Sequence, residues 1–253
     1  MLILDCRLPD TGDQRFDVRV TGDRVAAISQ HLDAEPEEHL VRAQGALLTS
    51  SLAEPHAHLD KAFLAERIAN PTGDLMGALR AMESNRDLIT VADTIERAER
   101  AVRLMVRYGV TAIRTHVDVN VDNGLTSIEA LLEVKLRVGD IVDMQICALL
   151  GWPLSGDGDT DRQHLTLGRR AHALGVDLIG GCPHLEDDSV AANIALVELA
   201  GELGCGLDLH TDEHTDASRV SLEDLAQRVI ATGFVNAVTA SHCVSLGMQS
   251  PID

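Results

Sequence analysis

The sequence predicts an α/β fold, and within that class a (β/α)8 TIM-type barrel of which about six βα units are present. One observation is a repeat in which five helical segments each end in glycine and lead into a short apolar stretch typical of a parallel strand. These glycines recur every 29 to 36 residues, the length of one βα unit, at Gly109, Gly139, Gly175, Gly204 and Gly233. The other observation is that histidines stand where most of the predicted strands end.

The first 50 residues follow a different pattern. Alternating polar and apolar residues flank Thr21, Gly22 and Asp23, which is a signal for a β-hairpin. One or two further short strands are expected within residues 37–50. We therefore predict two domains, a β-sandwich segment over residues 1–50 and a barrel over residues 51–253.

The barrel elements follow in a regular order. Its first strand is predicted within residues 47–58, and a long connection with its own helix follows over residues 61–90. Apolar residues at helical spacing then predict helices that alternate with apolar strands. The helices are expected within 94–109, 126–139, 161–175, 189–204 and 221–233, and the strands within 110–119, 141–151, 176–184, 205–214 and 235–243.

Imidazoles mark the carboxyl ends of these strands. His56 and His58 stand one residue apart, so in a strand both rings point to the same side. Other strands end at His116, His184, His210 and His242. A doubly wound sheet binds ligands only near a switch point, whereas in a barrel all strand ends converge on the active site. In addition, no glycine-rich phosphate loop follows any of the predicted strands. The histidines therefore favour the barrel.

These residue types indicate a metal site. Neutral imidazole is the commonest metal ligand near neutral pH, and we predict one divalent ion held by His56, His58 and His210. Glu213 follows three residues after His210 and is predicted to be the acid–base group. His242 is predicted to polarise the substrate or to hold the attacking water. The set suits metal-assisted hydrolysis of a carbon–nitrogen bond.

Other polar residues allow more than one interpretation. Lys61 either forms a local ion pair with Asp60 or reaches the substrate. His116 and His184 are expected to be supporting or structural residues, with His184 also a candidate substrate contact. Cys182 is interpreted as a thiol of the core, as is Cys243. Four histidines in loops or on helices are expected at the surface: His31, His39, His164 and His172.

Composition narrows the class of partner. The net charge of −19 argues against nucleic acid or an anionic membrane, since both require a basic surface. Five widely spaced cysteines without a CxxC pair are typical of a reduced, cytoplasmic setting, and we expect neither a signal peptide nor a membrane span. A small-molecule substrate is the expected partner, and the sequence leaves a homo-oligomer open.

Five motifs, EPHAHLDK, RTHVDV, PHLEDD, LHTDEHTD and VTASHC, occur in the order and spacing of cytosine deaminase and its relatives in the amidohydrolase superfamily. The chain resembles this family over nearly all of residues 45–245. The resemblance implies a (β/α)8 barrel with a flanking β-sandwich and one zinc or iron ion. It also implies metal-ligand roles for His56, His58 and His210, a proton shuttle at Glu213, and a polarising role for His242.

Two departures from the family pattern bear on function. Gly151 and Trp152 occupy the region where cytosine deaminase has a glutamine that pairs with the base. We therefore expect a different substrate, either a cyclic amide or an amino-substituted pyrimidine or triazine. Trp152 is a candidate contact for this substrate. The family's aspartate ligand at the end of strand eight has no counterpart within the 253 residues, so we expect a C-terminally incomplete barrel.

The expected activity is cytosine deaminase-like deamination of a heterocycle by a metal-activated water. One alternative is a truncated remnant that binds metal without catalysis or serves as an assembly partner. A second alternative is a binuclear, dihydroorotase-like amidohydrolase. That class carries a modified lysine at the end of strand four, whereas the fourth strand here ends in LIGGCPH.

Overall fold

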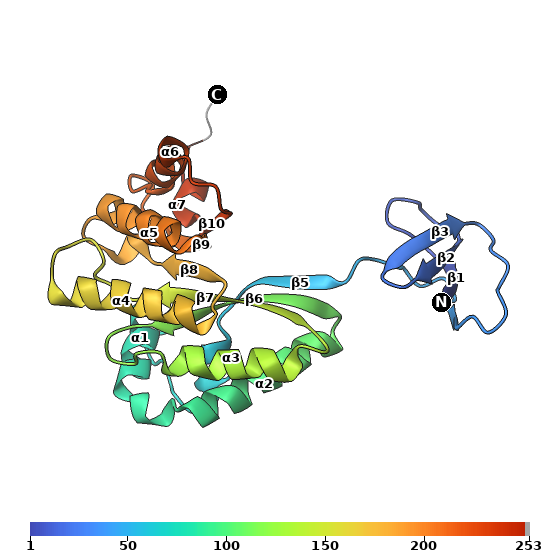
Figure 1. Ribbon diagram of the computed structural model, residues 1–253, viewed down its shortest axis with the longest axis horizontal. Helices are drawn as coiled ribbons and strands as arrows, with labels where there is room; N and C mark the ends of the chain where they lie inside the picture. Colours follow the sequence, from blue (N-terminus) through green and yellow to red (C-terminus); the bar gives the residue numbers. More distant parts are fainter. Residues whose placement is uncertain (251–253) are drawn as a thin grey trace. The chain divides into compact units, whose positions relative to one another are not determined.

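The computed structural model describes residues 1–250 and divides into two compact units, Met1–Ser51 and the chain from Leu52 onward. Figure 1 draws the smaller unit in dark blue and the larger one from cyan to red. Among the described residues, no helix has both the length and the apolar character needed to cross a membrane.

The smaller unit is a four-stranded sheet. It contains β1 (Leu2–Cys6), β2 (Phe16–Thr21), β3 (Arg24–Ser29) and β4 (Leu40–Arg42) in the spatial order β3-β2-β1-β4. Strands β2 and β3 form the predicted hairpin, in which Thr21 pairs with Arg24 and Gly22 turns the chain at φ +61°. Leu2, Cys6 and Val18 are its buried apolar side chains.

The larger unit is built on a six-stranded parallel sheet. Its strands are β5 (Leu52–Ala57), β6 (Val110–Val119), β7 (Asp143–Leu150), β8 (Leu178–Gly181), β9 (Gly206–Thr211) and β10 (Val238–His242). Each strand pairs in parallel with the next one along the chain, in the order β10-β9-β8-β7-β6-β5. This topology confirms the predicted α/β class and the six βα units.

Helices connect the strands. They are α1 (Leu75–Ser84), α2 (Val91–Arg107), α3 (Thr126–Val138), α4 (Asp159–Leu174), α5 (Ser189–Leu203), α6 (Leu222–Thr232) and the short α7 (Val244–Gly247). Asp74, Thr90 and Asp188 cap the N-termini of α1, α2 and α5 with side-chain oxygens. Single turns of 3-10 helix follow two strands, at Leu59–Lys61 (η1) and Pro183–Leu185 (η4), and two more occur at Leu64–Glu66 (η2) and Arg86–Leu88 (η3).

The helix ends agree with the glycine pattern at four of five positions. Gly175, Gly204 and Gly233 are left-handed C-caps, and Gly109 follows the cap of α2 at φ +91°. Gly139 differs from the prediction, because it ends α3 in the right-handed region at φ −64°. The chain leaves α3 through a bond from the Val142 amide to the Val138 carbonyl instead.

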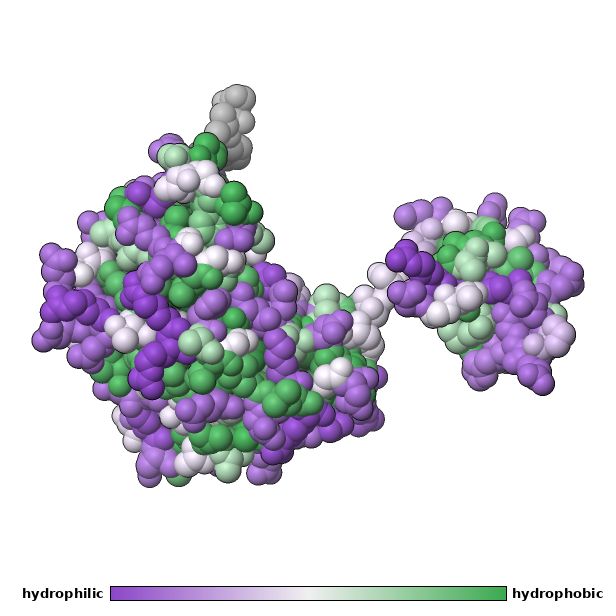
Figure 2. Space-filling view, in the orientation of Figure 1, coloured by the Kyte–Doolittle hydropathy of each residue, from purple (hydrophilic) through white to green (hydrophobic). Residues whose placement is uncertain are grey.

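The hydrophobic core lies between the sheet and its helices. Figure 1 shows α3, α4 and α5 running along one side of the sheet. Aliphatic side chains such as Leu131 of α3, Ile146 of β7 and Leu196 of α5 are fully buried in this layer. On the outer surface hydrophilic and hydrophobic residues are interspersed, as Figure 2 shows.

The sheet curls, so that its two edge strands approach one another across its other face. His56 of β5 and Ser241 of β10 are 185 residues apart, yet the His56 Nδ1 lies 3.2 Å from the Ser241 Oγ. Arg114 of β6 reaches Asp208 of β9 across the same space, with a separation of 2.8 Å. Polar side chains from non-neighbouring strands therefore meet inside the curved sheet, which is the condition for a shared site.

Candidate metal centre

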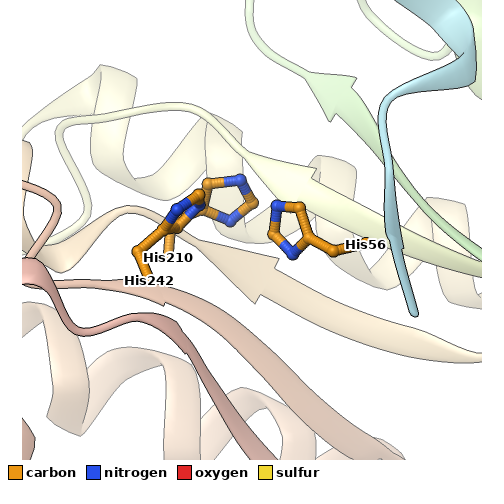
Figure 3. A group of neighbouring side chains, drawn as sticks. All are labelled: His56, His210 and His242. Carbon is orange, nitrogen blue, oxygen red and sulfur yellow. The ribbon is translucent and has the colours of Figure 1, made fainter. Parts of the chain in front are cut away.

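Five imidazoles gather at the carboxyl end of the parallel sheet. The centroids of their contacting ring pairs are 4.2 to 5.5 Å apart, and the residues are His56, His58, His116, His210 and His242. Figure 3 shows the ring of His56 approaching those of His210 and His242 from the opposite side. The prediction that the histidines converge from separate strand ends is correct. His116, expected only in a supporting role, is completely buried within the cluster.

The nitrogens of this cluster are close enough to share an ion. Two trios have ring nitrogens that all lie within 4.8 Å of one another, namely His56 with His210 and His242, and His56 with His58 and His116. The His58 Nε2 and the His210 Nε2 are 3.1 Å apart. Two nitrogens bound to one tetrahedral ion at about 2.0–2.1 Å would be separated by about 3.3 Å, so this spacing fits a metal. The ligand roles of His56, His58 and His210 remain a prediction.

Burial keeps the rings of His56, His58 and His210 neutral. It lowers the pKa of His56 to about 4 and that of His58 to about 2, and the neighbouring imidazoles add to the effect. The pKa of His210 is lowered for the same reason. The His56 Nε2 and the His210 Nδ1 are buried and have no hydrogen-bond partner among residues 1–250. Neutral rings with unpaired buried nitrogens are what a divalent ion requires.

Glu213 lies beside the cluster, just after β9. Its Oε2 is 3.6 Å from the His242 Nε2 and 3.9 Å from the His184 Nε2. The His184 Nδ1 bonds to the carbonyl oxygen of His210 at 2.9 Å, so His184 is fastened to the backbone of a candidate ligand. The carboxylate therefore faces two imidazoles at once, an arrangement in which a proton can be held and passed on.

Lys61 forms an ion-pair network rather than a single local pair. Its Nζ lies 2.7 Å from Asp118 Oδ1 and 3.2 Å from Asp60 Oδ2, and it is also 3.4 Å from the Nδ1 of His58. Asp60 is buried and accepts the backbone N–H of Asp118 at 3.0 Å. This network joins η1, which follows His58, to the end of β6.

Arg97 of α2 holds the same segment from the other side. Its Nη1 donates to the carbonyl oxygens of Asp60 and Ala62 at 2.9 and 2.7 Å, and its Nε donates to Asp93 at 2.8 Å. The backbone that follows the HxH motif is thereby fixed between a helix and a strand.

A pocket of about 910 Å³ opens at the cluster. All the predicted site residues line it: His56, His58, Lys61, Trp152, His184, His210, Glu213 and His242. Its outer wall is apolar and comes from the connection over residues 61–90, with Leu75, Leu79 and Met82 of α1 among its residues. A helix was expected in this connection, but nothing in its sequence indicated that it would face the site.

Two expectations are wrong in detail. His164, expected at the surface, is 3% exposed on the inner face of α4 and lines the pocket. Its Nε2 accepts the Val121 N–H, and its Nδ1 bonds to the Pro153 carbonyl, so it holds two loops at the pocket. Cys182 and Cys243 were interpreted as core thiols, but both are only partly buried. Cys182 lines the pocket, and burial raises its pKa.

Three polar residues near the site were not identified from the sequence. Asp208 is completely buried, Asp118 lines the pocket, and Ser241 contacts His56. The period of two in a strand would have revealed two of them, because Asp208 stands two residues before His210 and Asp118 two residues after His116. Ser241 carries no such signal, since it adjoins His242 and alternation places the two on opposite sides.

Comparisons with known proteins give a consistent result, although no protein-family model matches the chain. The pterin deaminase of Rhizobium rhizogenes is 34% identical over 200 residues, which cover 79% of this chain and 45% of that protein. The 5-methylcytosine deaminase structure from Klebsiella pneumoniae has a TM-score of 0.85 at 32% identity, covering 99% of this chain and 60% of that one. The N-isopropylammelide isopropylaminohydrolase structure from Burkholderia multivorans has a TM-score of 0.82 at 32% identity, and the match covers 98% of this chain and 62% of that one.

The chain spans about half the length of the curated relatives that it matches. The match to the 5-methylcytosine deaminase structure covers 99% of this chain and so takes in the parallel sheet. Sequence and structure together confirm the resemblance: the chain is a relative of the cytosine deaminase-like hydrolases of the amidohydrolase superfamily.

Proposed function

We propose that the chain carries the metal centre of a hydrolase that cleaves a carbon–nitrogen bond of an amino-substituted heterocycle. The observation that carries this proposal is the position of Glu213, whose Oε2 lies 3.6 Å from the Nε2 of His242, at the edge of the cluster of five imidazoles. The proposed ligands and the proposed acid–base group all line the same pocket.

One divalent ion, zinc or iron, is proposed to be held by His56, His58 and His210. When bound, such an ion lowers the pKa of a water towards 7 and so supplies a nucleophile near neutral pH. The second alternative from the sequence, a binuclear centre with a bridging lysine, is not supported, because β8 is followed by Cys182, Pro183 and His184. Lys61 does not serve as the bridging lysine instead, since two carboxylates already hold its ammonium group.

Glu213 is proposed to accept a proton at its carboxylate and to return it to the leaving nitrogen. A positioned group of this kind contributes about 10²–10⁴-fold to a rate. His242, which is partly exposed to the pocket and faces Glu213, is proposed to orient the carboxylate and to polarise the substrate. His184 supports Glu213 from the opposite side.

The proposed substrate is a planar, polar heterocycle with an exocyclic amino or alkylamino group. The three relatives are named for pterin, 5-methylcytosine and N-isopropylammelide, which share this chemistry. The pocket supports the same class, because its inner end is polar and Trp152, 40% exposed, provides an aromatic face for stacking. Glu186 fixes the following loop by accepting from the Leu154 N–H and the Ser155 hydroxyl.

The test is to load the purified chain with Zn²⁺ or Fe²⁺ and to measure release of ammonia or amine from aminopyrimidines, aminotriazines and pterin. Hydrolysis that is lost with a chelator and restored by the metal is the expected result. The proposal fails if the chain binds no divalent ion. If it binds the ion but hydrolyses nothing, the alternative of a metal-binding protein without catalysis replaces it.

A further inference from the structure

The ring of His56 is held by two successive hydrogen bonds, first to a serine hydroxyl and from there to a carboxylate. Its Nδ1 lies 3.2 Å from the Oγ of Ser241, and this hydroxyl donates to Oδ1 of Asp208 at 2.8 Å. The three groups come from β5, β10 and β9. We refer to them below as the His56 relay.

The charge state of Asp208 sets the direction of these bonds. The guanidinium group of Arg114, a permanent cation, pairs with this carboxylate. Arg114 Nη1 donates to Asp208 Oδ2 at 2.8 Å, and the His116 Nε2 is 3.1 Å from Oδ1. Asp208 is therefore an ionised carboxylate that only accepts hydrogen bonds.

The number of donor hydrogens decides which atoms of Ser241 and His56 carry them. Ser241 has one hydroxyl hydrogen, and the carboxylate of Asp208 takes it, so the Ser241 oxygen is left to accept from His56. The Nδ1 of His56 must then carry the single hydrogen of the neutral ring. Its Nε2 consequently presents a lone pair, and this nitrogen is buried without a hydrogen-bond partner in the part of the chain that the structure describes.

We propose that Ser241 and Asp208 are positioning residues that fix the tautomer and the ring direction of His56, so that its Nε2 is prepared for the metal. The inference rests on the metal site of the proposed function. Outer partners of this kind typically change metal affinity by about 10–100-fold when they are removed. Neither residue touches the ion or the substrate in this role.

The first test is the affinity for Zn²⁺, measured by competition with a chromophoric chelator. Ser241→Ala removes the acceptor for His56 and should weaken binding by about 10–100-fold. Ser241→Thr keeps the hydroxyl and should restore affinity close to that of the unchanged chain. Thr232→Val is the control, because the Thr232 hydroxyl donates only to the carbonyl oxygens of Arg228 and Val229 within α6 and contacts no member of the relay.

The outcomes separate this inference from the proposed function. If the unchanged chain binds no Zn²⁺, the metal site and the positioning roles both fail. If it binds Zn²⁺ and Ser241→Ala binds equally tightly, only the positioning roles fail. Loss of affinity in Ser241→Ala with recovery in Ser241→Thr supports the relay.

A second measurement needs no variant of Ser241 or Asp208. Long-range ¹⁵N–¹H correlation spectra of the metal-free chain, labelled at histidine nitrogens, report which ring nitrogen carries the hydrogen. His56→Gln identifies the His56 signals by their disappearance. We expect the hydrogen of His56 on Nδ1; a hydrogen on Nε2, or fast exchange between the two nitrogens, would overturn the proposal even if Ser241→Ala failed to fold.

Discussion

The Nε2 atoms of His58 and His210 lie 3.1 Å apart, although 152 residues separate the two histidines. Both rings are neutral because burial lowers both pKa values, so without an ion one ring donates its hydrogen to the other. A bound ion would take the place of that hydrogen and use both lone pairs. The contact between His58, which follows β5, and His210 of β9 therefore fits the proposed metal site.

Replacement of His210 should therefore remove the ion. In His210→Ala the Nε2 of His58 loses its counterpart and one of the three predicted ligands is gone. We expect the metal content after extensive dialysis to fall from about one ion per chain to near zero, as measured by elemental analysis. His31→Ala is the control, since the His31 side chain is 79% exposed in the smaller unit. Unchanged metal content in His210→Ala would remove this residue from the ligand set.

Replacement of Glu213 should separate metal binding from turnover. Glu213→Gln keeps the size of the side chain but cannot take up a proton, so turnover should fall by about 10²–10⁴-fold while metal content stays the same. Glu198→Gln on the exposed side of α5 is the matched control. Near-normal turnover in Glu213→Gln would transfer the proton shuttle to another group, and His184 would be the first to examine.

The sequence was sufficient to predict the larger unit because its pattern repeats. Each strand lies between glycine-terminated helices, and the period is long enough to identify a βα unit without reference to packing. The burial of His164 could not be predicted from this pattern. On a helix, burial depends on which face meets the sheet, and His164 shares its face with Leu167 and Ala171, a contact that exists only after folding.

The sequence predicted which strand-end residues lie together at the pocket, but it did not identify the residues behind them. His56, His210 and His242 could be identified because parallel strands end at one edge. Ser241 supports His56 only because the sheet curls until β5 and β10 approach one another, and no local pattern encodes that curvature.

Acid should destabilise the metal-free chain through the same histidines. The pKa of His56 is about 4 in the folded chain, against about 6.5 for an unperturbed histidine. Between these values the unfolded chain binds a proton that the folded chain does not. The contribution of His56 to the free energy of unfolding is therefore fully present above pH 6.5 and is lost as the pH falls towards 4. The slope is up to about 1.4 kcal/mol per pH unit for one histidine.

Urea denaturation in the presence of a chelator, repeated from pH 7.5 to 4.5, measures this dependence. His56→Gln should show a shallower fall of the free energy of unfolding over the same range, because one of the titrating groups is absent. An identical slope in the variant and the unchanged chain would contradict the assignment to His56.

The last prediction decides between the two interpretations of Lys61. Lys61 lies between Asp60, which is 3% exposed at its side chain, and Asp118, which is 29% exposed and lines the pocket. Lys61→Met would leave the two carboxylates facing one another without a cation. Breaking a buried ion pair typically costs about 3–5 kcal/mol, and since Lys61 is 24% exposed we expect a loss of about 2–4 kcal/mol in the free energy of unfolding.

The double variant Lys61→Met with Asp118→Asn should recover part of this loss, because it removes one of the unpaired charges. Burial raises the pKa of Asp60, so the remaining acid can take up a proton instead of keeping an unpaired charge. Urea denaturation of the metal-free variants measures the coupling. A different result is a free energy of unfolding equal to that of the unchanged chain, together with a raised KM of the metal-loaded Lys61→Met variant. In that case Lys61 acts on the substrate, and its contacts with Asp60 and Asp118 only position its ammonium group at the pocket.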